Sequence, residues 1–282
     1  MFQYDISTEE FDLIAEYIYQ EIGIHLPKHK ITLVRSRLSK RLRHLGLNSF
    51  TEYYNYLLDE RTGEELLMLT NEISTNVTSF FREPSQWEYL EEELLNVIDI
   101  NKKEKKIRIW SSACSSGQEP YTIIMFLMNT LKNPLQWDIK ILATDISEEI
   151  LEKAQAGIYS SEDVKGLPIN MINNFFLKEQ IQTKEGKKIK YRIKENIKKY
   201  ITFRKFNLVL GDYSFIKEGT FDWIFCRNVM IYFDKETKES VVLNLINKVK
   251  KEGHFLIGHS ESLVTMNSKL ISLIAPSIYK KK

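Results

Sequence analysis

Cysteine is almost missing from this 282-residue sequence, which has only Cys114 and Cys226 and no CxxC pair. Two isolated cysteines argue against a disulfide framework or a zinc site, and they favour a reducing compartment. Long apolar runs are missing too, since none approaches the roughly 20 residues that cross a bilayer. The acidic N-terminus, MFQYDISTEEFD, lacks an apolar signal core. We therefore expect a cytoplasmic protein with no segment inserted into a membrane.

The sequence also lacks an excess of either charge, because 40 basic and 38 acidic side chains leave a net charge of +2. Net charge therefore says little about partners. Hydrophobic residues at 43% and charged residues at 28% are typical of a globular protein and exclude a disordered one. The chain is long enough for one large domain or two smaller ones, each with its own core.

Two regions with different hydrophobic patterns follow one another. From about residue 8 to 75, apolar residues recur at helical spacing, and Gly46 stands where one such helix would end. From about residue 106, short apolar runs typical of buried strands alternate with helical stretches, which predicts a parallel sheet covered on both faces. The expected strands are 107–110, 139–143, 223–226 and 255–257, and the expected helices are 120–132, 148–156 and 236–250. A basic insertion at about 172–205 alternates apolar and polar residues and predicts a small antiparallel appendage.

Glycine is scarce at the place where a nucleotide cofactor would bind. The stretch IRIWSSACSSGQEPYTIIMFLM predicts a strand, a turn of small residues and a helix, and Gly117 is the only glycine in the turn. The next strand ends in Asp145, which could accept hydrogen bonds from the ribose of an adenosine. The same geometry serves nicotinamide cofactors and S-adenosylmethionine alike, and the missing GxGxxG pattern disfavours a nicotinamide-dependent oxidoreductase. Capping of the next helix is the alternative role for Asp145.

Six segments together indicate a particular protein family: STNVTSFFRE at 74–83, SSACSSGQEPY at 111–121, ATDIS at 143–147, FNL at 206–208, FDWIFCRNVMIYFD at 221–234 and GHSESL at 258–263. In this order they resemble the chemotaxis-receptor glutamate methyltransferases of the CheR type, and the resemblance covers nearly the whole chain. It implies an α/β fold in which a helical N-terminal domain (1–75) faces the receptor and a linker (76–91) contributes to the cofactor site. A Rossmann-like class I methyltransferase domain (92–282) with the β insertion would follow.

The resemblance also implies which residues bind the cofactor. Glu119 and Asp145 would be the acidic anchors of the cofactor, and Asn76, Thr78 and Arg82 would contact it from the linker. Asn207 and Leu208 would flank the adenine, and Arg227 and Asn228 would close the site. A helix cap or turn is the alternative role for Asn76 and Thr78. Phe80 and Phe81 are expected in the core.

The implied reaction transfers a methyl group from S-adenosylmethionine to a glutamate carboxylate of a chemoreceptor, giving a methyl ester and S-adenosylhomocysteine. A glutamate with a pKa near 4.3 is already ionised at neutral pH, so no general base is needed and no metal is expected. Positioning can supply roughly 7–11 kcal/mol of the barrier. Tyr232 is the candidate for orienting the carboxylate, with a buried core tyrosine as the alternative. RNVMIY departs from the Asn/Asp-Pro-Pro-Tyr motif of amino-group methyltransferases, which favours an oxygen acceptor.

A basic stretch from 28 to 43 contains seven cations and no acid. A solvated helix face or a nucleic-acid contact could explain it. The resemblance favours the acidic cytoplasmic helical bundle of a chemoreceptor instead, and the candidate contacts are Arg35, Arg37, Arg41 and Arg43. Members that grip a receptor's C-terminal peptide carry a glycine-bearing loop in the insertion, whereas LKEQIQTKEGKK has only Gly186, so we expect no such tether.

Two other functions remain as alternatives: a nucleic-acid methyltransferase, and a non-catalytic signalling module that binds S-adenosylmethionine. The first is supported by the basic stretch and opposed by RNVMIY. We expect a monomer that binds no nucleic acid.

Overall fold

A computed structural model describes residues 4–60, 62–73, 78–101, 103–183, 186–264, 266 and 269–282. The chain divides into two compact units. The first comprises Met1–Asn76 and Tyr232–Lys238, and the second comprises Val77–Ile231 and Glu239–Lys282. None of the described helices is both long enough and apolar enough to span a bilayer.

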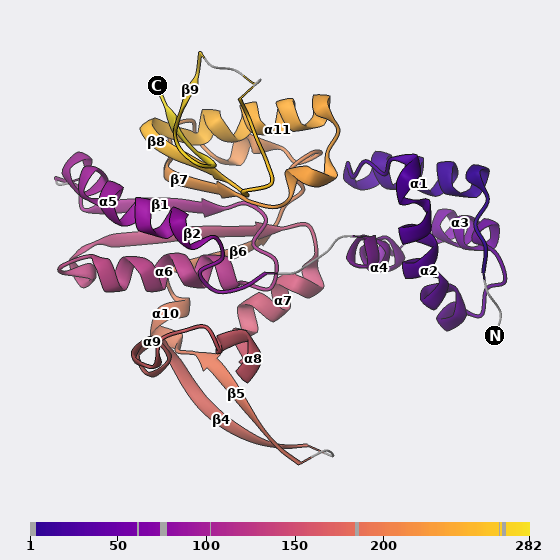
Figure 1. The fold of residues 1–282 in the computed structure, drawn as a ribbon, viewed down its shortest axis with the longest axis horizontal. Helices are drawn as coiled ribbons and strands as arrows, with labels where there is room; N and C mark the ends of the chain where they lie inside the picture. The colour runs from indigo at the N-terminus through magenta and orange to yellow at the C-terminus, as the bar shows by residue number, and fades with distance from the viewer. Residues whose placement is uncertain are drawn as a thin grey trace. The chain divides into compact units, whose positions relative to one another are not determined.

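The first unit is helical, as the sequence predicts. Its helices are α1 (Thr8–Ile22), α2 (Ile31–Leu45), α3 (Phe50–Asp59) and α4 (Glu64–Ile73), with a short 3-10 turn at Lys28–Lys30 (Figure 1). Ser7 caps α1 in a reciprocal capping box with Glu10, and Gly46 ends α2 in the left-handed conformation (φ 72°) that glycine adopts without strain. The apolar stripes of these helices are buried and form the core of the unit.

Two arginines of α2 hold α4. The Arg41 guanidinium donates from Nε to both carboxylate oxygens of Glu65 at 3.0 and 3.1 Å, and Tyr53 Oη donates to the same carboxylate at 2.7 Å. Arg37 Nη1 donates to the carbonyls of Glu72 and Ile73 at 2.8 and 2.9 Å. The basic helix therefore does have an acidic partner, which lies 24 residues further along the chain. The sequence shows no acid within the basic stretch, because the acid that pairs with Arg41 is buried on a neighbouring helix.

The second unit contains a seven-stranded sheet in the order β6-β2-β1-β7-β8-β10-β9. The four strands predicted from apolar runs are confirmed as its parallel centre. The sequence did not predict the edge formed by β9 and β10, where β10 runs antiparallel to both of its neighbours. The strands are β1 (Lys106–Ser111), β2 (Asp138–Asp145), β6 (Ile201–Lys205), β7 (Phe221–Cys226), β8 (Val249–Ile257), β9 (Ile271–Ala275) and β10 (Ile278–Lys281).

The connections reverse direction at β1. The chain passes from β1 through α6 (Gln118–Thr130) to β2 on one side, and from β7 through α11 (Lys235–Lys248) to β8 on the other. Right-handed crossovers in opposite directions put α6 and α11 on opposite faces of the sheet (Figure 1). In an open parallel sheet, ligands bind beyond the carboxyl ends of the strands at such a switch point. The loops that follow β1, β2, β7 and β8 are therefore the expected place for a site.

Aromatic side chains fill both faces of the sheet. On one face, Trp87 of α5 (Pro84–Ile100) stacks on Phe225 with ring centroids 5.6 Å apart. On the other face, Trp110 lies against Phe221 and donates from its indole nitrogen to Thr144 Oγ1 at 2.9 Å. The ends of β1 and β7 are thereby packed on both sides, which gives the adjoining loops a rigid base.

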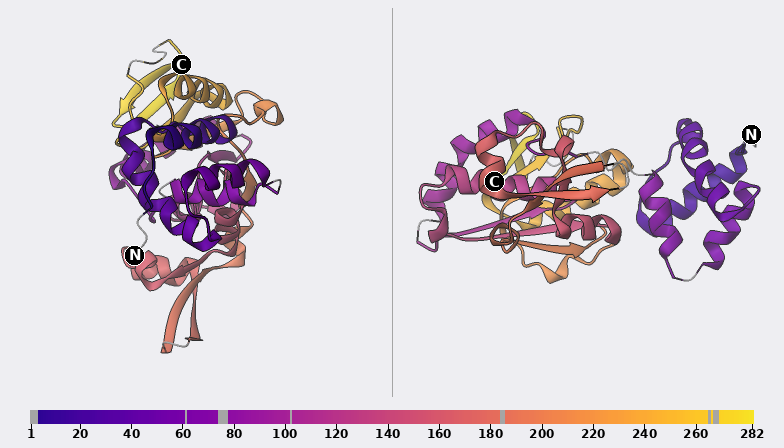
Figure 2. Two further views of the ribbon diagram at one scale, coloured as in Figure 1. Left: turned by 90° about the vertical axis from the view of Figure 1, so that its right-hand side faces the viewer. Right: turned by 90° about the horizontal axis from the view of Figure 1, so that it is seen from below.

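A second, three-stranded antiparallel sheet has the order β3-β5-β4. Its strands are β3 (Ile158–Ser160), β4 (Phe176–Thr183) and β5 (Gly186–Ile193), and the β4–β5 pair extends away from the main sheet (Figure 2). The predicted appendage is therefore present, but its predicted limits were wrong at both ends. β6 pairs with β2 in the main sheet, because a half-exposed edge strand alternates in the same way, and the short β3 was missed. The helices α8 (Ser161–Val164) and α9 (Ile169–Phe175) pack against this sheet, whereas α7 (Glu148–Ala156) packs against β2 and β6 of the main sheet and α10 (Glu195–Lys198) lies beside α6.

We predict that Arg41→Met lowers the free energy of unfolding by about 3 kcal/mol, because it leaves the Glu65 carboxylate buried without its counter-charge. Arg43→Met is the matched control on the same helix. Arg43 is exposed, so its replacement should change stability by less than about 0.5 kcal/mol. Urea denaturation followed by circular dichroism measures both variants, and equal stability of the two would contradict the structural role of Arg41.

Candidate active site

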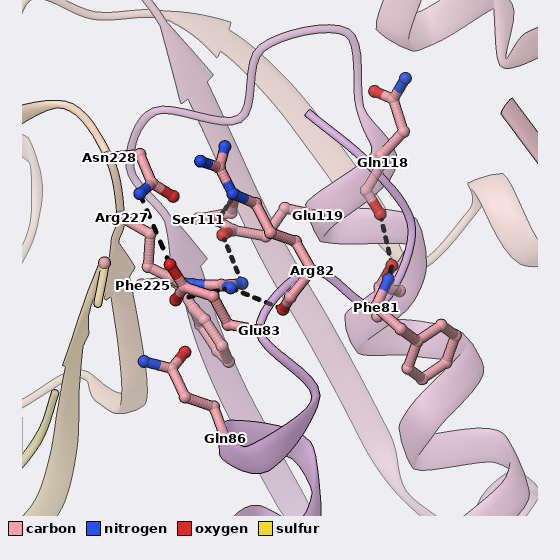
Figure 3. A network of polar contacts seen from close by, with 12 residues as sticks. Phe81, Arg82, Glu83, Gln86, Ser111, Gln118, Glu119, Phe225, Arg227 and Asn228 are labelled. Carbon is pink, nitrogen blue, oxygen red and sulfur yellow. Dashed lines mark hydrogen bonds and ion pairs between the residues drawn. The ribbon is translucent and has the colours of Figure 1, made fainter. Parts of the chain in front are cut away.

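The carboxyl end of β7 carries a buried arginine with two acidic partners. Arg227, with a side chain 3% exposed, donates to Glu83 Oε2 from Nε at 3.2 Å and from Nη2 at 2.9 Å. Its Nη1 donates to Glu119 Oε2 at 3.2 Å, and its Nη2 also donates to the carbonyl of Arg82 at 2.6 Å. Figure 3 shows these groups converging from the loop before α5, the start of α6 and the end of β7. We call the four groups the Arg227 cluster.

The two carboxylates of the Arg227 cluster have opposite pKa shifts. Burial raises the pKa of Glu119, and the opposing effects of Arg227 and of the Ser111 hydroxyl, 2.7 Å away, do not cancel this rise. Burial acts on Glu83 in the same direction, but the charge of Arg227 and the hydrogen bond from the His259 N–H outweigh it and lower its pKa. One guanidinium thus compensates one carboxylate well and leaves the other partly uncompensated.

The loop before α5 is fixed from several directions. Phe81 (φ 50°) and Glu83 (φ 59°) both adopt the left-handed backbone region, which is strained for such residues. The Phe81 N–H donates to Thr122 Oγ1 of α6 at 3.2 Å, and Trp87 Nε1 donates to the Arg82 carbonyl at 3.0 Å. Phe80 is buried in the core and Phe81 packs against it, as expected from the sequence. These contacts hold Glu83 where Arg227 can reach it.

The turn after β1 comes close to other chain segments and has no spare room. Gly117 has φ 94°, and a Cβ there would lie 3.0 Å from Ala154 Cβ and from the hydroxyl oxygen of Tyr159. Tyr159 Oη donates to the Ser116 carbonyl at 2.9 Å, so β3 of the small sheet supports this turn. The buried Ser115 Oγ has no hydrogen-bond partner among the described residues. The close packing explains why glycine is needed at position 117, and the orphaned buried hydroxyl is a feature that fits a ligand lying over the turn.

Asp145 ends β2 beside this turn. Its Oδ2 accepts from the Ser115 N–H at 2.9 Å and its Oδ1 from the Ser147 N–H at 3.1 Å. Burial raises the pKa of Asp145 despite these hydrogen bonds. Ser147 itself caps α7, accepting from the Ile150 N–H at 3.3 Å, so Asp145 is not the helix cap. A carboxylate held beside the turn in this way has acceptor capacity left for a ligand.

Asn207 and Leu208 follow β6, which pairs with β2 so that the Phe206 N–H donates to the Asp145 carbonyl at 2.9 Å. Leu208 is buried. Asn207 Oδ1 accepts from the N–H groups of Val209 and Leu210 at 2.8 and 3.2 Å and shapes the loop. A hollow of about 330 Å³ opens beside it and is lined by Arg204, Lys205, Phe206, Asn207, Gly211, Asp212 and Phe215.

The expected site residues are only partly brought together. The Arg227 cluster joins Arg82, Glu119 and Arg227, and Asn228 Nδ2 lies 3.5 Å from Glu83 Oε1. The pair Asn207 and Leu208 lies beside Asp145 through the β6–β2 pairing. Thr78 is half-buried at the start of the loop, and Asn76 lies outside the described residues.

Tyr232 belongs to the first unit. Its carbonyl accepts from the His25 N–H at 2.8 Å, and Lys30 Nζ lies 5.7 Å from the centre of its ring. The ring is half-buried. It is therefore not the fully buried core tyrosine considered as an alternative.

Sequence reasoning missed Glu83 and Tyr159. Glu83 ends the segment STNVTSFFRE, and a carboxylate so close to Arg82 could have been taken as its ion-pair partner. Its real partner is Arg227, 144 positions away. Tyr159 stands in a short strand with no recognisable pattern, so nothing in the local sequence indicated its contact with the cofactor turn.

Known protein families match the helical N-terminal region and the α/β region of the chain separately. The model of the CheR methyltransferase all-alpha domain matches residues 9–74, and that of the CheR methyltransferase SAM binding domain matches residues 76–278. The chain is 38% identical to the chemotaxis protein methyltransferase of Borreliella burgdorferi, over 98% of this chain and 95% of that protein. It is 37% identical to the one from Escherichia coli, over 91% and 85% of the two chains. Chemotaxis protein methyltransferase 2 of Pseudomonas aeruginosa is 36% identical, over 98% and 94%.

A methyltransferase that uses S-adenosylmethionine is the class that this fold, the site and the matched domain define. The chain belongs to the CheR methyltransferase family, matched across both of its domains. The cofactor fits the residues present, since two carboxylates, Glu119 and Asp145, flank a turn in which the buried Ser115 hydroxyl has no hydrogen-bond partner among the described residues.

We predict opposite effects on the cofactor-free protein when each carboxylate of the Arg227 cluster becomes an amide. Glu83 has a lowered pKa, so its charge stabilises the fold above its ordinary pKa of 4.5, and this stabilisation is lost as pH falls through the lower folded value. Glu83→Gln should therefore lose about 1–3 kcal/mol at pH 7 and differ less from wild type below pH 4.5.

Glu119→Gln is the matched comparison. The raised pKa of Glu119 means that its contribution to stability is present at low pH and is lost as pH rises through the folded value. The amide should therefore be at least as stable as wild type at pH 7 while it binds cofactor more than about tenfold more weakly. Urea denaturation at pH 7 and pH 4 gives both comparisons. A large loss of stability at pH 7 in Glu119→Gln would show that the pKa of Glu119 is lowered in the folded protein and not raised.

Proposed function

We propose that this methyltransferase transfers a methyl group from S-adenosylmethionine to glutamate side-chain carboxylates of chemoreceptors in the cytoplasm. The family match over both domains supports the proposal, as do relatives whose names are chemotaxis protein methyltransferase. The observation that carries it is the arrangement at the switch point. Buried carboxylates there would face a cationic cofactor, and Arg227 engages both carboxylates of the Arg227 cluster.

The strand order indicates which end of the cofactor would lie beside β2 and which beside β7. Asp145 ends β2 and would accept from the ribose, with Asn207 and Leu208 beside the adenine. Because β1 lies between β2 and β7, a ligand that crosses the turn extends its other end toward β7. There Glu119 would hold the cofactor's α-amino group, and Arg227 would hold Glu119. The loop of Thr78 and Arg82, together with Asn76, would cover this end, and Asn228 would border it.

S-adenosylmethionine supplies an electrophilic methyl group on a positively charged sulfur. A carboxylate oxygen of the substrate forms the new C–O bond, the electrons of the broken C–S bond return to sulfur, and no proton moves. The protein therefore has to align the carboxylate with the C–S bond and exclude water from it. Because glutamate is ionised at neutral pH, the site needs no base to activate it. Tyr232 remains our candidate for orienting the carboxylate.

The packing of the arginines of α2 changes which of them we propose as receptor contacts. Arg37 and Arg41 hold α4, so their main role is to stabilise the fold. Lys40 and Arg43 are exposed, and Arg35 is half-exposed in a 3.0 Å ion pair with Asp5. We propose that Arg35, Lys40 and Arg43 attract the acidic helical surface of the receptor.

The small sheet offers a second surface through β4, which is an edge strand of that sheet. Gly186, the first residue of β5, is the only glycine of the stretch LKEQIQTKEGKK, so we propose that receptor recognition here does not depend on a C-terminal peptide.

The decisive experiment incubates the protein with methyl-labelled S-adenosylmethionine and the cytoplasmic fragment of a chemoreceptor. We predict label on the receptor that mild alkali releases as methanol, because methyl esters hydrolyse under conditions that leave methylated amines and bases intact. The rate should be nearly independent of pH from about 6 to 8, since the acceptor is fully ionised there. Label stable to alkali, or label on nucleic acid in a parallel reaction, would refute the proposed acceptor.

We predict that the double charge reversal Lys40→Glu with Arg43→Glu lowers kcat/KM for the receptor by about tenfold, with a smaller deficit at high salt. Cofactor affinity should not change. Lys106→Glu with Lys165→Glu changes the net charge equally at exposed positions of the second unit and serves as the control. Equal methylation kinetics in the two double variants would remove α2 from the receptor contact.

A further inference from the structure

One buried carboxylate outside the Arg227 cluster holds two loops of the site by their backbones. Glu261 is 7% exposed and accepts three main-chain hydrogen bonds. The N–H groups of Asn228 and Gly258 donate to its Oε2 at 3.0 and 2.7 Å, and the Met230 N–H donates to its Oε1 at 2.8 Å. Asn228 and Met230 lie after β7, whereas Gly258 lies after β8. A single side chain thus ties together the loops that follow two adjacent parallel strands.

The backbone that Glu261 holds is not one that the loop would adopt freely. Asn228 has φ 59°, a left-handed conformation that asparagine tolerates better than most residues but still at a cost. Gly258 lies so close that a Cβ there would meet Asn228 Nδ2 at 2.4 Å. The direction of the Asn228 side chain therefore depends on the Glu261 carboxylate, which accepts from the Asn228 N–H, and on the missing side chain at Gly258.

The same two loops are joined a second time through Glu83. Its Oε1 accepts from the His259 N–H at 2.9 Å and lies 3.5 Å from Asn228 Nδ2. His259 follows Gly258, and Asn228 follows Arg227 of the cluster. Glu261 and the Arg227 cluster therefore act on neighbouring residues of one wall, which lies at the β7 side of the cofactor turn.

We propose that Glu261 is a positioning residue for methyl transfer, setting the Asn228–Met230 loop that borders the reactive end of the cofactor. It acts through backbone N–H groups and touches neither cofactor nor acceptor. The role of Glu261 in catalysis rests on the proposed function, because the proposed function places the incoming glutamate beside this wall. A carboxylate suits the task because it only accepts hydrogen bonds, whereas an amide turns N–H groups toward one of the three donors.

The test compares Glu261→Gln with Asp222→Asn. Asp222 is equally buried, at 4% exposed, and also accepts three hydrogen bonds, from the Arg108 N–H, Asn101 Nδ2 and Lys250 Nζ at 2.8, 2.8 and 2.7 Å. It lies near the amino-terminal end of β7, away from the site, so its amide variant controls for a general loss of stability. Calorimetric titration with S-adenosylhomocysteine counts the sites able to bind, and turnover is expressed per such site.

Glu261→Gln should lower kcat per binding site by about tenfold or more, because small displacements of a positioning wall are costly. Its affinity for S-adenosylhomocysteine should stay within about threefold of wild type, and Asp222→Asn should keep wild-type turnover per site. Turnover per site equal to wild type in Glu261→Gln would overturn the proposal, as would equal losses in both variants.

Two further measurements keep the result interpretable. If Glu261→Gln does not fold, Gly258→Ala displaces the same loop by contact with Asn228, and it should show the same loss of kcat per site. Amide hydrogen exchange at Asn228, Met230 and Gly258 should be faster in Glu261→Gln than in Asp222→Asn, whether or not a receptor is methylated. Unchanged exchange would refute the role of Glu261 alone, whereas an inactive wild type with the expected exchange would refute only the proposed function.

Discussion

The site depends on one buried guanidinium held between two carboxylates. A buried cation is tolerated only when it is paired and its hydrogen bonds are satisfied. Arg227 meets this requirement with Glu83, Glu119 and the Arg82 carbonyl, which come from the loop before α5 and the start of α6. The loop, the cofactor turn and the end of β7 therefore cannot separate without exposing a charge. This explains how the strained backbone at Phe81 and Glu83 is maintained.

The same cluster prepares the site for a cationic ligand. Two carboxylates share the Arg227 guanidinium, and burial raises the pKa of Glu119 and also that of Asp145 beside the cofactor turn, so negative charge is unfavourable at both positions without a nearby cation. A ligand with an α-amino group and a sulfonium would supply the missing positive charge. In the absence of its ligand, the protein is therefore less stable than it would be with a site that carried no unfavourable charge. This loss of stability is a common cost of a preorganised binding site.

The sequence predicted the central strands, the helices of the first unit and the place of the cofactor turn, because each leaves a local periodic or compositional pattern. It failed where a contact joins distant segments. Arg41 was a candidate receptor contact, and its pairing with Glu65 on another helix was not predicted. The strand β6 was assigned to the appendage because all half-exposed strands alternate alike. Arg227 was expected to close the site itself. Its partner Glu83 and the bridging carboxylate of Glu261 were not predicted, since nothing in a local stretch records a contact across more than 30 positions.

The central claim is that Glu83 acts on cofactor binding through Arg227, which in turn holds Glu119, and a double-mutant cycle tests this most directly. Calorimetry would measure binding of S-adenosylhomocysteine to wild type, Glu83→Gln, Arg227→Met and the double variant. If the cluster acts as a unit, the double variant binds no more weakly than Arg227→Met, which gives a coupling free energy on the order of 1–3 kcal/mol. Additive losses, with a coupling near zero, would show that Glu83 and Arg227 act independently and would contradict the account.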